Sequence, residues 1–151
     1  MSEQIKQVGV VGLGVMGFDI AFLYAMKGFR TVVYDAAKAA MDLISDRREQ
    51  TIERLQKRNR ISDSEAENVR KLLTPSSDLG GLARMDLVTE EVSENARTKM
   101  AVYRDLRSAG FSGILTTNTS SVTRATLLAG DDYDRRKFVL THFFNPVLYT
   151  Q

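Results

Sequence analysis

Residues 12–17 read Gly-Leu-Gly-Val-Met-Gly, a glycine spacing that suits the binding of a dinucleotide pyrophosphate. In such a site Gly12 permits a tight turn, Gly14 lets the anion approach the backbone, and Gly17 lets a helix pack closely on a strand. The helix that follows presents unpaired backbone N–H groups to the phosphates. A plain strand-to-helix turn would show the same glycines, so both interpretations stay open at this point. The candidate cofactor-binding residues here are Gly12, Leu13, Gly14, Val15, Met16 and Gly17.

Asp35 follows the apolar run 30–34 and lies 18 residues after Gly17. An acid at this place accepts hydrogen bonds from the adenosine ribose and repels a 2′-phosphate, so we expect NAD rather than NADP as the cofactor. An aspartate before Ala36 also suits a helix N-cap. We favour the ribose role, which does not exclude capping.

A single histidine, His142, offers general-base chemistry. Removing the proton of an alcohol near neutral pH requires a base such as imidazole. His142 stands at the end of a predicted strand, 137–143, where open α/β sheets bind their ligands. Taken alone, a histidine there is more often a packed or surface residue, and Ser120 alone is more often a helix cap than a catalytic group.

The composition excludes several other chemistries. With no cysteine and one histidine, the 151 residues cannot build a disulfide, an iron–sulfur cluster or a multi-histidine metal site, so we expect no metal. The 21 basic and 19 acidic residues nearly cancel, which argues against nucleic acid as a partner. No apolar run is long enough to span a membrane, and the N-terminus lacks a signal-peptide pattern. We expect a cytoplasmic protein with no membrane contact.

Strands and helices alternate along the chain, an order typical of a doubly wound α/β fold with a mostly parallel sheet. We expect one Rossmann-type domain over 1–151, with a helical hairpin inserted after the second strand. Ser62 and Glu65 fit a capping box at the start of the second arm, and Thr74-Pro75 ends that arm. The expected strands are 7–11, 30–34, 85–89, 113–117 and 137–143, and the expected helices are 16–28, 36–60, 62–73, 95–109 and 120–128.

Three further motifs follow in order: Glu94-Asn95-x-x-x-Lys99, Asn118-Thr-Ser120-Ser121 and His142-Phe-Phe-Asn145-Pro146. With the glycine turn and Asp35, this set resembles the NAD-binding domain of the L-3-hydroxyacyl-CoA dehydrogenases, including the 3-hydroxybutyryl-CoA enzymes. The resemblance extends from Val8 to Val147, and its most specific element is the string HFFNPV. It implies an oxidoreductase that oxidises the 3-hydroxyl of an acyl-CoA and passes a hydride to NAD.

The resemblance implies a role for each matching residue. His142 would be the general base, Ser120 would hydrogen-bond the reacting oxygen near the nicotinamide, and Asn145 belongs to the same catalytic signature. The residues expected to line the cofactor site are Glu94, Lys99, Asn118 and Ser120. From the residues alone, the two charged members of this last set also fit as solvated charges that favour opposite ends of a helix dipole.

Three positions depart from the resembled pattern. Asp19 puts a carboxylate in the expected first turn of the phosphate-binding helix, where it suits the dipole but competes with the pyrophosphate. Glu91 follows Glu90, and because neighbouring strand residues face opposite ways, we expect one of these acids to face the cofactor cleft and weaken NAD binding. Leu148 stands where the resembled enzymes commonly have a second proline.

The sequence ends at Gln151, before the glutamate that pairs with the histidine in the resembled enzymes and before their all-helical domain. That domain closes over the acyl-CoA and forms the dimer interface. We therefore expect this chain alone to bind NAD but to be inactive or weakly active, and we expect a homodimer only with that domain.

Basic residues of the expected hairpin lie on the CoA side of the cleft in the resembled enzymes. A solvated helix face explains them equally well, because acidic residues are interleaved. These basic residues are Arg47, Arg48, Lys57, Arg58 and Arg60.

Two other functions stay open. A nucleotide-binding module without turnover would share the glycine turn and Asp35. A 3-hydroxyacid dehydrogenase acting on free acids has a similar glycine start, but such enzymes usually rely on a lysine base and often use NADP. Asp35 and the motifs at 118–121 and 142–146 argue against the free-acid function.

Overall fold

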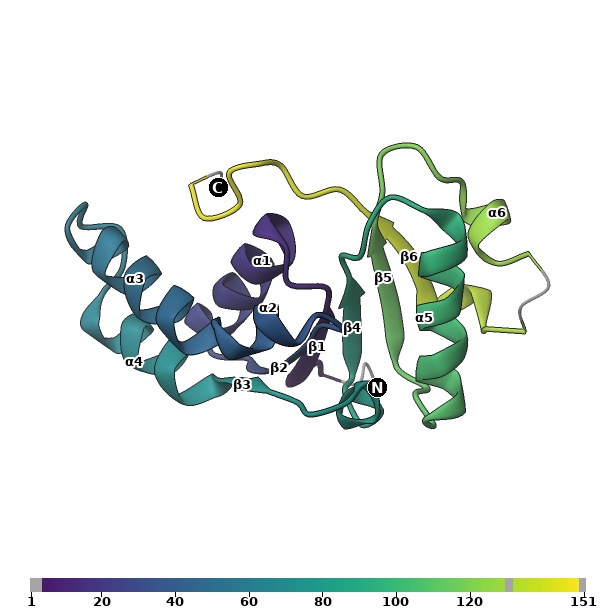
Figure 1. The fold of residues 1–151 in the computed structure, drawn as a ribbon, viewed down its shortest axis with the longest axis horizontal. Helices are drawn as coiled ribbons and strands as arrows, with labels where there is room; N and C mark the ends of the chain where they lie inside the picture. The colour runs from purple at the N-terminus through teal and green to yellow at the C-terminus, as the bar shows by residue number, and fades with distance from the viewer. Residues whose placement is uncertain (1–3, 130–131, 150–151) are drawn as a thin grey trace.

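Six parallel strands form one sheet in the computed structural model, which describes residues 4–129 and 132–149 (Figure 1). The strands stand in the order β3-β2-β1-β4-β5-β6. The chain therefore starts inside the sheet and reverses its direction of travel between β3 and β4, which is the topology of a doubly wound fold. This order confirms the predicted fold class. The strands are β1 (Gln7–Val11), β2 (Arg30–Tyr34), β3 (Leu73–Pro75), β4 (Leu87–Glu90), β5 (Ile114–Asn118) and β6 (Phe138–Thr141).

The buried apolar residues form two cores. In one core, Phe18 of α1, Ile52 of α3 and Val69 of α4 are buried. In the other, Tyr103 and Leu106 of α5 are buried. The helices are α1 (Val15–Met26), α2 (Lys38–Asp42), α3 (Ile44–Gln56), α4 (Asp63–Leu72), α5 (Ala96–Ser108) and α6 (Arg124–Leu127), with 3₁₀ turns η1 (Leu79–Leu82) and η2 (Arg135–Lys137).

Several elements begin and end where the sequence predicts. β1 and β2 coincide with the predicted runs, because both are largely buried stretches rich in valine. The capping box at α4 is also confirmed. The N–H of Glu65 donates to the Ser62 hydroxyl (3.2 Å), and the N–H of Ser62 donates to the Glu65 carboxylate (3.0 Å).

Two other predictions are wrong in detail. The stretch 36–60 is not one helix, because it divides at Leu43 into α2 and α3. Thr74 and Pro75, expected only to end a helix, belong to strand β3 at the edge of the sheet, where it pairs with β2. Proline is tolerated there because an edge strand leaves one row of its backbone groups unpaired. No helix within the described ranges is both long enough and apolar enough to cross a membrane.

Candidate functional site

The turn between β1 and α1 admits only glycine at two of its positions. Gly12 has a φ of +93°, and a Cβ there would lie 2.7 Å from the carbonyl of Glu91. A Cβ on Gly17 would lie 1.8 Å from the carbonyl oxygen of Gly12. At Gly14, the N-cap of α1, a Cβ would meet nothing within 4 Å. The turn is therefore closed toward the sheet and open above Gly14, which fits a pyrophosphate against the helix N-terminus.

Asp35 follows β2 and holds this turn in place. Its Oδ2 accepts a hydrogen bond from the N–H of Leu13 (2.7 Å), and its Oδ1 accepts one from the N–H of Ala37 (2.7 Å). Ala37 is the N-cap of α2, so Asp35 does not have the capping role considered from the sequence. Each carboxylate oxygen keeps further acceptor capacity. The carboxylate thus stands beside the turn with lone pairs that suit ribose hydroxyls.

Arg47 of α3 contacts the same turn, and the sequence analysis missed this contact. Its guanidinium donates to the carbonyl oxygens of Leu13 (2.6 Å) and Gly14 (3.2 Å). It also lies 4.1 Å from the centroid of the Phe18 ring. Nothing in the sequence indicates this contact, because Arg47 is one of several basic residues in the segment after β2. The guanidinium fixes the turn's carbonyl groups and places a positive charge beside the candidate anion site.

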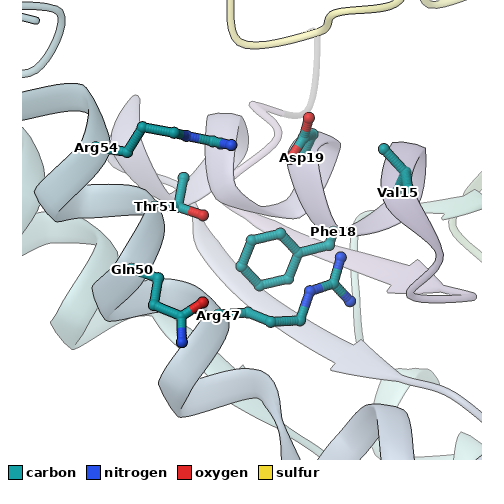
Figure 2. A pocket seen from close by; sticks show the side chains of 7 residues that line it. All are labelled: Val15, Phe18, Asp19, Arg47, Gln50, Thr51 and Arg54. Carbon is teal, nitrogen blue, oxygen red and sulfur yellow. The ribbon is translucent and has the colours of Figure 1, made fainter.

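A pocket of about 350 Å³ lies between α1 and α3 (Figure 2). It is lined in part by Val15 and Asp19 of α1 and by Arg47 and Arg54 of α3. Because α1 begins at Val15, Asp19 lies in the second turn, and the expectation of a first-turn carboxylate is wrong. Burial raises the pKa of Asp19, and the positive charges of Arg54 and Arg47 oppose that rise. Its carboxylate therefore faces two guanidinium groups.

A buried ion pair joins the end of β4 to α5. The Nζ of Lys99 lies 3.0 Å from Oε1 of Glu90, and both side chains are fully buried. The hydroxyls of Tyr103 and Thr117 donate to Glu90 (2.7 and 2.6 Å), and Lys99 also donates to the backbone carbonyl of Asn118 (3.2 Å). The interpretation of Lys99 as a solvated charge is therefore wrong. Its ammonium ties together the strand ends at which the other candidate residues stand.

Glu94 organises the loop after β5. One of its carboxylate oxygens accepts hydrogen bonds from the backbone N–H groups of Ser120 (3.1 Å) and Ser121 (3.2 Å), and from the hydroxyls of Ser121 (3.0 Å) and Thr119. Burial alone would raise the pKa of Glu94, but these hydrogen bonds lower it to about 2. The carboxylate also lies 3.6 Å from the ammonium of Lys99. These hydrogen bonds hold residues 119–121 in a loop, so the expected helix 120–128 is wrong and only α6 is helical.

The segment after β6 carries His142 and Asn145, both exposed. The ring of His142 stacks on Phe144 with the centroids 5.4 Å apart. The N–H of Phe143 donates to Oδ1 of Asn118 (3.3 Å), so Asn118 links this segment to β5. Figure 1 shows the segment running from β6 over the carboxyl ends of the strands toward α1. Within the described ranges, no hydrogen bond joins His142 to the serine loop.

Glu91 faces away from the buried ion pair, toward Asn118 and α1. Its carboxylate accepts a hydrogen bond from Nδ2 of Asn118 (2.9 Å). Burial raises the pKa of Glu91 to about 7; the negative charges of Glu90 and Glu94 add to the rise, while Asn118 and Lys99 oppose it. Of the two neighbouring acids, Glu90 is therefore enclosed in the core and Glu91 lies on the side of the glycine turn.

One known protein family matches nearly the whole chain. The family model described as the NAD-binding domain of 3-hydroxyacyl-CoA dehydrogenase matches residues 7–151. The chain belongs to this family. NAD is the cofactor that the family binds, and the open space above Gly14 and the carboxylate of Asp35 are compatible with a dinucleotide.

Curated relatives and solved structures agree with this membership. The chain is 33% identical over 149 residues to a 3-hydroxybutyryl-CoA dehydrogenase of Mycobacterium tuberculosis, covering 97% of this chain and 52% of that protein. It is 32% identical over 147 residues to the fatty acid oxidation complex subunit alpha of Idiomarina loihiensis, covering 97% of this chain and 20% of that protein. The chain thus spans about half the length, or less, of these curated relatives.

Two solved structures have the same fold. FadB2 of M. tuberculosis superposes with a TM-score of 0.88 and 31% identity, over 96% of this chain and 51% of that chain. The (S)-3-hydroxybutyryl-CoA dehydrogenase of Ralstonia eutropha superposes with a TM-score of 0.84 and 28% identity, over 95% of this chain and 51% of that chain.

The substitution Lys99→Met tests the buried ion pair. It leaves the Glu90 carboxylate buried without its partner, so we expect the free energy of unfolding, measured by urea denaturation, to fall by about 3–5 kcal/mol. Lys57→Met is the matched control, because Lys57 forms an exposed pair with Glu53 (2.6 Å) and should matter little. Equal effects of the two substitutions would contradict the structural role of Lys99.

The substitution Glu91→Gln tests the raised pKa of Glu91. A carboxyl whose pKa rises from 4.5 to about 7 on folding stabilises the protein most at low pH, and this stability is lost as the pH rises from 4.5 through 7. Glutamine undergoes no such loss. Relative to the original chain, Glu91→Gln should therefore gain on the order of 2 kcal/mol in unfolding free energy between pH 5 and pH 8, allowing for partial exposure.

Urea titrations at both pH values measure this gain. Glu67→Gln is the control, because Glu67 is an exposed carboxylate of α4 far along the chain from the site. Parallel stability–pH curves for the original chain and Glu91→Gln would show that Glu91 titrates normally.

Proposed function

We propose that this chain is the NAD-binding part of a dehydrogenase that oxidises the 3-hydroxyl group of an acyl-CoA with NAD. Family membership and the named activity of the M. tuberculosis relative support the proposal. The main structural support is that the side chain of Asn118 forms hydrogen bonds with two parts of the candidate site. Its amide nitrogen binds Glu91 beside the glycine turn, and its amide oxygen binds the segment of His142. The cofactor site and the candidate base are thereby connected through one side chain.

The residues that would hold the cofactor lie at the carboxyl ends of β1 and β2. The pyrophosphate would lie over Gly14, where the backbone is open, and the adenosine ribose would donate to Asp35. The amides of Val15 and Met16 belong to the first turn of α1 and would donate to this anion, whereas the N–H of Leu13 already donates to Asp35 (2.7 Å). When bound, NAD accepts the hydride that leaves the substrate carbon.

The proton chemistry belongs to the chain's own side chains. The imidazole of His142 would take the proton of the 3-hydroxyl, and the hydroxyl of Ser120 would donate a hydrogen bond to the same oxygen. Glu94 fixes the backbone of Ser120, so that its exposed side chain projects from a rigid loop. Asn145 stands three residues beyond His142 on the same exposed segment and would contribute to the same site.

We also propose that the isolated chain binds NAD but has little or no turnover. Among the described residues, no hydrogen bond to a carboxylate orients the exposed ring of His142, and a general base without an orienting partner is inefficient. The acyl-CoA would then need a further helical domain, which would also form a homodimer. A cytoplasmic location and the absence of nucleic-acid partners are part of the same proposal.

The second candidate is a nucleotide-binding module without turnover. The unoriented imidazole of His142 favours it for the isolated polypeptide. The family match, in contrast, favours acyl-CoA over free hydroxy acids as the substrate of an active form.

His142→Gln separates an enzyme from a binding module. In the full-length gene product, assayed with acetoacetyl-CoA and NADH, we expect this substitution to reduce kcat by roughly 10²–10⁴-fold while leaving the Kd for NAD unchanged. Unchanged turnover would remove His142 from the mechanism. A full-length product that binds NAD but does not turn over before any substitution would establish the module instead.

Asp35→Asn tests the selection of NAD over NADP. Asparagine is nearly isosteric and keeps one acceptor oxygen, which serves either Leu13 or Ala37, but it removes the charge that repels a 2′-phosphate. We expect the ratio of the Kd for NADP to the Kd for NAD to fall by roughly tenfold, about 1.4 kcal/mol, in fluorescence titrations. Asp42→Asn is the control, because Asp42 is an exposed acid of α2 that pairs with Lys38. An unchanged ratio would show that Asp35 does not read the ribose.

A further inference from the structure

The carboxylate of Glu91 lies beneath the glycine turn. The N–H of Glu91 donates to the carbonyl of Val11 (2.7 Å), which places Glu91 directly beside the end of β1. The carbonyl of Glu91 lies 2.7 Å from the point that a Cβ on Gly12 would occupy. The Cβ of Glu91 lies 3.1 Å from the point that a Cβ on Gly17 would occupy. The side chain therefore leaves the backbone in contact with both ends of the segment that would bind the pyrophosphate.

One oxygen of this carboxylate is unsatisfied. Asn118 donates to Oε2 (2.9 Å), whereas Oε1 is buried and has no hydrogen-bond partner among the described residues. A buried, unpaired oxygen of an ionised carboxylate is costly, and the cost falls when the group is protonated. The environment of Glu91 therefore favours the protonated, uncharged carboxylic acid over the carboxylate.

The charges around Glu91 come from each element packed against it. Tyr24 of α1 lies close enough for the charge of Glu91 to raise the pKa of its hydroxyl, although burial is the main cause of that rise. Glu90 of β4 and Glu94 of the next loop are negative, and Lys99 of α5 is positive. Lys99 pairs with Glu90 at 3.0 Å and lies 3.6 Å from Glu94, so one positive charge is shared among several acids and only partly offsets the charge of Glu91.

We propose that binding of the pyrophosphate of NAD at the glycine turn favours the protonated form of Glu91, which takes up protons from solvent, so that the protonation of Glu91 controls cofactor affinity. This inference rests on the proposed function. The pyrophosphate brings negative charge to the turn that Glu91 contacts, and two like charges in a partly desolvated site disfavour each other's presence. Protonation removes the repulsion, and dissociation of NAD returns the proton to solvent.

The size of the effect follows from linkage. Glu91 ionises near neutral pH in the free protein. If the bound anion raises its pKa by one unit, the Kd for NAD increases by about tenfold between pH 6 and pH 9. At pH 7.5 the same shift corresponds to an uptake of about half a proton for each NAD bound.

Isothermal titration calorimetry measures this uptake directly. The binding enthalpy of NAD is determined at pH 7.5 in Hepes and in Tris, whose ionisation enthalpies differ, and the difference gives the number of protons taken up. The chain is compared with Glu91→Gln, which keeps an oxygen that can accept from Asn118, and with Glu67→Gln as the matched exposed control. ADP-ribose serves as a second ligand because it carries the pyrophosphate without nicotinamide.

We expect about half a proton for the original chain and for Glu67→Gln, with both ligands, and none for Glu91→Gln. We also expect Glu91→Gln to bind NAD with nearly the same Kd at pH 6 and pH 9. No uptake by the original chain, equal uptake by Glu91→Gln, or uptake with NAD but not with ADP-ribose would each overturn the inference. Absence of NAD binding at every pH would overturn the proposed function itself, and this inference with it.

Discussion

The arrangement of this site depends on the buried ion pair between Glu90 and Lys99. Both charges are out of contact with water, so each relies on the other and on the hydroxyls of Tyr103 and Thr117 for stabilisation. The same ammonium reaches the carbonyl of Asn118 and approaches Glu94. One buried cation thereby fixes the ends of β4 and β5 and the start of α5. The loops that carry the candidate site residues begin at these fixed points.

Asn118 extends this order across the carboxyl edge of the sheet. Its backbone is held by Lys99, and its side chain connects Glu91 beside the glycine turn with Phe143 next to His142. A residue expected only to line the cofactor site thus positions two other parts of it. The side-chain amide of Asn118 therefore links the carboxylate of Glu91 directly to the segment that carries the candidate base.

The sequence predicted most of the fold because local patterns encode it. Valine-rich runs define β1 and β2, and the Ser62 capping box defines the start of α4. Prediction from the sequence failed where contacts between residues distant in sequence determine the local structure. Pro75 belongs to a strand because β3 pairs with β2 and forms the edge of the sheet, and Arg47 contacts a turn 34 residues away. Lys99 resembles a surface charge in the sequence, yet it is buried because Glu90 of β4 pairs with it. The local spacing of residues does not reveal such a partner.

We propose that the pyrophosphate of NAD binds on the turn at residues 12–17. The most direct measurement is a titration of the ¹⁵N-labelled chain with NAD, followed through the backbone amide resonances. The expected result is saturable shifts that are largest at Leu13–Met16 and extend to Asp35, because the first amides of α1 would donate to the anion and the hydrogen bond from Leu13 to Asp35 adjoins it. Shifts confined to the α3 side of the pocket between α1 and α3, or none at the glycine turn, would contradict the account.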